Sequence, residues 1–98
     1  MSAPYSRHEI TAMFAPTQSA FYQQKLADAY ASIAALPVLK DGWSDWTKYA
    51  AIVPRTSRAA ASLRVIRLID AGLVQTQFSG NRGTRFRVVP RQDREETQ

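Results

Sequence analysis

Apolar residues recur through the first half of the chain with the three- and four-residue spacing of α-helices. The longest stripe predicts an amphipathic helix over 18–36, with Thr17 as its N-cap and Pro37 at its end. Its apolar positions are Tyr22, Leu26, Ala29, Ile33 and Leu36. The stripe is expected to face either the core or a second subunit.

A shorter helical segment is expected before it, between Arg7 and Ala15, because its apolar residues fall on one side and Pro16 stops the pattern. Those residues are Ile10, Met13 and Phe14. The two ends of the chain, 1–7 and 90–98, are polar or charged and contain proline, so both are expected to be flexible. The predicted domain therefore spans 8–89.

A second short helix is expected from Trp43 to Ile52, after the turn-forming Lys40-Asp41-Gly42. Its Trp46, Tyr49 and Ala50 would face the core. Val53-Pro54-Arg55 must interrupt this helix, since the residue before a proline is disfavoured in the helical region and proline cannot continue a helix.

The next helix is predicted over 56–71, with Thr56 or Ser57 as its N-cap and Gly72 at the position past its end. Residues at helical spacing on it should face the core. These residues are Ala61, Val65, Leu68 and Ala71.

The pattern then changes to that of strands, over Leu73 to Phe78 and Thr84 to Val89, joined by a hairpin connection at 79–83. The second strand alternates, with Phe86 and Val88 on one face and two arginines on the other. The expected fold is mainly α with a small β-hairpin at 73–89.

Charge is distributed unevenly along the chain. Residues 1–54 sum to zero, whereas residues 55–91 carry eight arginines against the single carboxylate of Asp70. Arginine binds phosphate and guanine edges through a planar fork, and neutralising a polyanion releases counterions. A solvated basic face that keeps the protein soluble is the alternative reading of the same charges.

Composition removes several function classes. There is no cysteine and His8 is the single histidine, so disulfides, thiolate metal sites and histidine-rich zinc sites cannot form within one chain. No apolar run is long enough for a membrane span, and no signal peptide is recognisable at the N-terminus. We expect a cytoplasmic, nucleoid-associated protein without membrane contact, cofactor or metal. It is expected not to be an enzyme, because no nucleophile, base and orienting group can be assembled.

The order helix, short helix, turn, helix and arginine-tipped hairpin resembles the winged helix-turn-helix family. The run RLIDAGLV at 67–74 is similar to the end of the recognition helix and first wing strand of MarR-type bacterial regulators, and residues 79–85 resemble a glycine-rich wing tip in composition. The resemblance implies three or four helices plus a two-stranded wing. It also implies a homodimer that binds double-stranded DNA as a transcriptional regulator, with helix 56–71 in the major groove.

That resemblance places the DNA contacts on the third helix and the hairpin. Arg58, Ser62 and Arg64 would reach base edges, while Thr56 and Arg67 would meet phosphates. The wing would contribute minor-groove and backbone contacts. The full set of expected DNA-binding residues is Arg55, Thr56, Ser57, Arg58, Ser62, Arg64, Arg67, Asn81, Arg82, Arg85 and Arg87.

Two groups of residues depart from the family pattern or have two readings. Ala59, Ala60, Leu63 and Ile66 lie off the core face of the third helix, where a groove reader usually carries polar side chains. They would contact thymine methyl groups, a partner subunit as in TubR-type centromere-binding proteins, or helix 18–36 or the N-terminal segment of their own chain. The last of these three readings is favoured. Trp43 and Trp46 are expected in the core or as a lid over it rather than stacked on bases.

Two other functions fit the same pattern. One keeps DNA binding but serves plasmid or phage partition, replication or excision. The other is a winged helix whose basic face docks an acidic protein. A homodimer is expected to use the helix from Thr17 to Leu36 or the segment before it, since the third helix and hairpin would be occupied by DNA.

Overall fold

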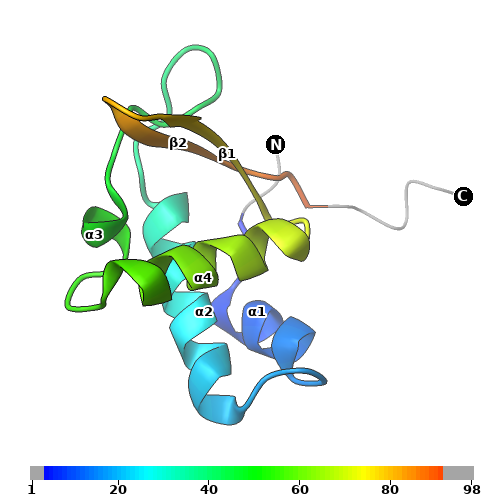
Figure 1. Cartoon of the computed structure of the whole chain (residues 1–98). Helices are drawn as coiled ribbons and strands as arrows, with labels where there is room; N and C mark the ends of the chain where they lie inside the picture. The colour runs from blue at the N-terminus through cyan, green and yellow to red at the C-terminus, as the bar shows by residue number, and fades with distance from the viewer. Residues whose placement is uncertain (1–3, 92–98) are drawn as a thin grey trace, which may run out of the picture.

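The computed structural model describes residues 4–91, and it contains four helices followed by two strands (Figure 1). The elements are α1 (Arg7–Phe14), α2 (Ala20–Ala34), α3 (Tyr49–Ile52), α4 (Arg58–Asp70), β1 (Val74–Ser79) and β2 (Gly83–Val88). The strands form an antiparallel hairpin in which Val74 is opposite Val88 and Phe78 is opposite Thr84. The predicted class, mainly α with a small hairpin, is confirmed.

Three serines begin the long helices. Ser6, Ser19 and Ser57 each accept a hydrogen bond from the backbone N–H three residues later, which satisfies one of the free amides of a first turn. Ser57 is one of the two N-caps expected for α4. Thr17 is not the N-cap of α2, because residues 15–17 still turn at the end of α1 and the helix begins only at Ala20.

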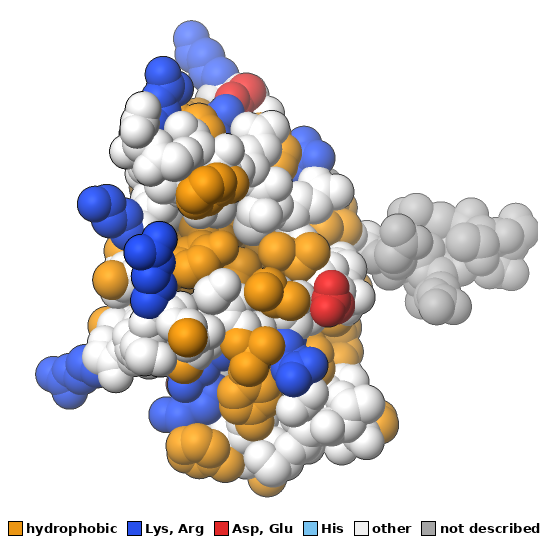
Figure 2. Space-filling view, viewed as in Figure 1, with side chains coloured by type: hydrophobic (Ala, Val, Ile, Leu, Met, Phe, Trp, Pro, Cys, Tyr) orange, Lys and Arg blue, Asp and Glu red, His pale blue; other side chains and the backbone are white. Residues whose placement is uncertain are grey.

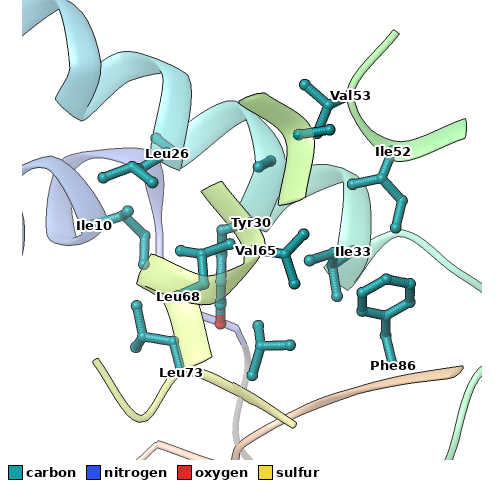
Figure 3. Close-up of a cluster of buried hydrophobic side chains, with 14 of the residues drawn as sticks. Ile10, Leu26, Tyr30, Ile33, Ile52, Val53, Val65, Leu68, Leu73 and Phe86 are labelled. Atoms are coloured by element: carbon teal, nitrogen blue, oxygen red, sulfur yellow. The ribbon is translucent and has the colours of Figure 1, made fainter. Parts of the chain in front are cut away.

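The core lies where α2 and α4 cross and where the hairpin covers them (Figure 3). Most of the predicted inward positions on these two helices are buried, and each large aliphatic side chain removed from water contributes about 1.5–3 kcal/mol. Ala71 and Ala50 are exposed, contrary to prediction, because α4 has ended before Ala71 and α3 turns Ala50 outward. The buried residues are Ile10, Phe14, Leu26, Ala27, Ala29, Tyr30, Ile33, Ile52, Val53, Ala61, Val65, Leu68, Leu73, Val74 and Phe86.

The segment expected as a helix from Trp43 to Ile52 is helical only over α3. Residues 43–47 are instead extended alongside β2, where the backbones of Thr47 and Thr84 exchange two hydrogen bonds of 2.8 Å. The Ser44 N–H also donates to the Phe86 carbonyl at 2.9 Å. Aromatic and β-branched residues suit such pairing, and the tertiary hydrogen bonds outweigh the local helical pattern. Residues 43–47 therefore add an irregular third segment to the hairpin, paired with β2.

The described parts of the two ends are packed together rather than free. The Tyr5 N–H donates to the Tyr30 hydroxyl at 3.1 Å, and Arg91 forms an ion pair of 2.6 Å with Glu9 while covering the Tyr5 ring. The flexibility expected for 1–7 and 90–98 stays a prediction. Residues 1–3 and 92–98 lie outside the described residues. Among the helices of residues 4–91, none is long and apolar enough to cross a bilayer.

Candidate nucleic-acid interface

The start of α4 and the tip of the hairpin face each other across a cleft of about 380 Å³. Three of the expected DNA-binding residues, Thr56, Arg58 and Asn81, line it together although they are distant in sequence. Lys48 and Phe78 also contribute to its walls, and no described carboxylate does. The fold therefore gathers a polar, positively charged set of side chains at one point.

The turn before α4 brings the arginines to this cleft. Arg55 has a backbone φ of 62°, in the left-handed region that lets the chain reverse between α3 and α4. Ser57 then caps the helix through the Ala60 N–H at 3.1 Å, so this serine side chain already has a structural partner. The free amides and positive dipole end of α4 point toward the same region as Arg58, which favours a bound anion.

The arginines of α4 and of the hairpin tip have no carboxylate partner among the described residues. The ion pairs of residues 4–91 join Arg7 to Asp28, Arg85 to Asp41 and Arg91 to Glu9. Figure 2 shows Lys and Arg side chains along the side of the molecule where Figure 1 places the start of α4 and the hairpin tip. The described arginines without a carboxylate partner are Arg55, Arg58, Arg64, Arg67, Arg82 and Arg87.

The outward face of α4 is apolar. Leu63 is 43% exposed and Ile66 is 46% exposed, and Ala59 is exposed beside them. Figure 2 shows hydrophobic side chains across the middle of the face that α4 crosses in Figure 1. The interpretation that Leu63 and Ile66 pack on helix 18–36 or on the N-terminal segment is therefore wrong, because the helix rotation set by Ala61, Val65 and Leu68 turns them to the surface.

The remaining expected contacts on α4 lie on its flanks. Arg64, Arg67 and Ser62 are half-buried, and the Nε atoms of both arginines are covered and have no hydrogen-bond partner among residues 4–91. Ser62 lies one turn after Arg58 on the same side of α4, whereas the apolar face separates Arg64 and Arg67 from Arg58. The structure thus does not bring all the expected α4 residues into one outward row.

Arg85 and Arg87 belong to a stack of arginine and tryptophan on the outer face of the hairpin. The Arg85 side chain is 15% exposed, donates to the Ser44 carbonyl at 3.1 Å and lies 5.4 Å from the Trp46 ring centre. Arg87 lies 4.5 Å from the Trp43 ring centre and also bonds Gln75. Both wing arginines thus have hydrogen-bond partners and an indole ring within their own chain.

The tryptophans are not buried in the core, which was one of the two positions expected for them, the other being a lid over it. Both are half-buried and cover the arginines of β2, and Arg82 at the hairpin tip is 5.6 Å from the Trp46 ring centre. Guanidinium groups are attracted to indole faces by the ring quadrupole. The sequence contains both partners of this stack, the two tryptophans at 43 and 46 and the two arginines that alternate along β2. Their pairing could not be read from it, because it requires residues 43–47 to lie beside β2.

Asp41 closes this stack from the preceding loop. Its pKa is held below the ordinary value by the hydrogen bond from Arg85 and then by the Trp43 backbone N–H, which donates at 3.1 Å. Asp41 therefore remains charged over the usual pH range and neutralises Arg85. On the hairpin, Arg82 at the tip and Arg87 on β2 have no carboxylate partner among the described residues.

A second hollow, of about 810 Å³, lies between the end of α2 and residues 88–91 and is largely apolar. Arg87 is the expected DNA-binding residue on its wall. Among the described residues, no group of three His, Asp or Glu side chains is placed to hold a metal ion. Comparison with protein families, curated proteins and solved structures finds no match to this chain.

Proposed function

We propose that this chain is a winged helix-turn-helix protein that binds double-stranded DNA sequence-specifically and acts as a transcriptional regulator. The observation that carries the proposal is the cleft that joins Arg58 at the start of α4 to Asn81 at the hairpin tip. In this proposal α3 and α4 form the helix-turn-helix, and the hairpin is the wing.

The start of α4 enters the major groove in this arrangement. Arg58, exposed and without an ion-pair partner in the described chain, reaches a base edge, while Arg55 and Thr56 meet the backbone. Asn81 and Arg82 reach the adjacent minor groove from the wing. Arg85 and Arg87 stabilise the wing by stacking on the two indoles, and their positive charges attract the DNA phosphates at longer range.

The protein is proposed to work as a homodimer in the cytoplasm, associated with the nucleoid, without a cofactor and without catalytic activity. A dimer places two copies of α4 on successive turns of one DNA face, which a palindromic site would match. A protein that acts in plasmid or phage partition, replication or excision would make the same contacts, but on an array of repeated sites.

Titration of a labelled random-sequence duplex by fluorescence anisotropy tests the proposal. We expect tight binding at low salt that weakens steeply as salt is added, because the contacts release counterions. Selection from a randomised duplex pool should then return one preferred site. Absence of binding at low salt would reject a DNA-binding function.

A second candidate function is a protein-interaction module, and the apolar outward face of α4 favours it. Leu63 and Ile66 are exposed where a groove-reading helix usually carries polar groups. Under this alternative, duplex DNA fails to bind, and an acidic protein with an apolar contact surface binds α4. The same anisotropy experiment separates the two functions.

A further inference from the structure

Phe78 is the most exposed large apolar side chain of the described chain, at 74%. It is the fifth residue of β1, next to the hairpin tip, and it is opposite Thr84 in the strand register. Thr84 and Phe86 on the same face of the hairpin are buried against the helices. Phe78 shares that face but lies beyond the helices, so its ring stands over the cleft.

The surroundings of this ring are cationic and polar. Phe78 lines the cleft with Lys48, Arg58 and Asn81, and no described carboxylate lines it. Arg82 is exposed at the adjoining tip. An aromatic ring among cations matches a nucleic acid, whose bases offer flat apolar faces and whose phosphates are negative.

The hairpin holds the ring on a firm support. Thr47 and Thr84 exchange two backbone hydrogen bonds directly across from Phe78, and Gly83 packs against the Thr47 backbone. Arg82 is stacked on Trp46 on the other side of the tip. A side chain that separates stacked bases must resist being pushed back, and these contacts provide that resistance.

We propose that Phe78 is a wedge that stacks on a partly unstacked base step of bound DNA, at the point where the wing meets the groove beside α4. Lys48 holds a flanking phosphate, Arg58 reaches a base edge in the major groove, and the Asn81 amide faces base edges in the minor groove. Insertion of an apolar side chain between base steps kinks a duplex, so the DNA bends at the wing. This inference rests on the proposed DNA-binding function and adds a DNA deformation to it.

The test compares a matched duplex with one that carries a single mismatch and a 2-aminopurine beside it. A mismatched step is already weakly stacked, so the wedge should enter it at less cost. We expect tighter binding to the mismatched duplex and brighter 2-aminopurine as its neighbour is displaced. Phe78→Ala should lower affinity for the mismatched duplex by about tenfold or more, as loss of base–aromatic stacking does, and abolish the fluorescence change.

Two variants control for indirect effects. Val38→Ala truncates an apolar side chain of similar exposure, 70%, which lies after α2, outside the cleft and outside the helix expected to join the two copies, and should leave both signals unchanged (Figure 1). Phe78→Tyr keeps the aromatic face and should retain both. Thermal unfolding of Phe78→Ala should match the parent protein, because the ring contributes little to the core.

The outcomes separate the wedge from the proposed function. If Phe78→Ala binds the mismatched duplex as tightly as the parent protein and raises the 2-aminopurine fluorescence by the same amount, the wedge is overturned while DNA binding stands. If Val38→Ala loses the signals to the same extent, the effect is not specific to the cleft and the wedge is again overturned. If no duplex binds at low salt, both the proposed function and the wedge fail.

Discussion

Gly83 and Thr47 are in such close contact that a β-carbon on residue 83 would lie 2.4 Å from the Thr47 carbonyl oxygen. Gly83 also has a φ of 108°, which side-chain-bearing residues rarely adopt. Gly83→Ala should therefore lower the free energy of unfolding by about 1–3 kcal/mol, since the strand must shift or adopt a strained conformation. Chemical denaturation measures the change.

Gly80 provides the matched control at the same hairpin tip. A β-carbon there meets nothing within 4 Å, and its φ is not in the left-handed region. Gly80→Ala should leave stability within about 0.5 kcal/mol of the parent. Equal losses in the two variants would contradict the role given to the Gly83–Thr47 contact.

The exposed face of α4 should matter little for the stability of a single chain. Leu63→Gln keeps helix propensity and removes a side chain that is 43% exposed, so the free energy of unfolding should change by less than about 0.5 kcal/mol. Leu68→Ala, one turn further on the buried face, should lose about 2–5 kcal/mol.

Sedimentation of Leu63→Gln then tests which face joins two copies. The expected homodimer uses the helix from Thr17 to Leu36 or the segment before it, so association should be unchanged in this variant. A dimer of the parent protein that becomes monomeric in Leu63→Gln would instead place the contact on α4.

Arg58 and Arg82 should differ in what they contribute to binding. Arg58→Ala should cost about 1–3 kcal/mol on the preferred site and little on random DNA, because it is proposed to read a base edge. Arg82→Ala should weaken binding to all duplexes and reduce the salt dependence by about one unit of slope. Anisotropy titrations over a salt series measure both, and equal effects of the two variants on random DNA would reject this division.

Glu9 should make stability depend on pH. Its pKa lies below the ordinary glutamate value of 4.5, because the Ser6 backbone N–H donates to it and Arg91 is close. A lowered folded-state pKa stabilises the protein above the unfolded-state pKa, and this stabilisation disappears as the pH falls through the folded-state value.

Glu9→Gln keeps an acceptor for the Ser6 N–H and removes the charge. The parent protein should therefore be more stable than Glu9→Gln at neutral pH, and the two should converge as the pH falls below the folded-state pKa of Glu9. Thermal unfolding at a series of pH values measures the difference. A difference that grows toward acid pH would have the wrong sign for this account.

Local patterns predicted the elements whose contacts are local. The apolar spacing of α2 and α4, the serine cap of α4 and the hairpin with Arg85 and Arg87 on its outer face were all visible in the sequence. Each depends on residues within a few positions of one another, so periodicity and capping rules are sufficient.

The failures involve partners that are far apart along the chain. Residues 43–47 look helical by apolar spacing, and only the bonds of Thr47 to Thr84 make them extended. The same pairing moves Trp43 and Trp46 from the expected core to the arginines of β2. The cleft between Arg58 and Phe78 could not be predicted either, because the angle between α4 and the hairpin sets it.

The bridge between Thr47 and Thr84 also affects the order in which the molecule opens and closes. A short turn closes the hairpin, whereas the bridge between Thr47 and Thr84 closes a long loop. Closing a long loop costs more conformational entropy, so we expect this bridge to form late in folding. Opening of this bridge would release the wing from residues 43–47 while the hairpin itself stays closed. The rate of hydrogen exchange at the amides of Thr47 and Thr84 would therefore report how often the wing detaches.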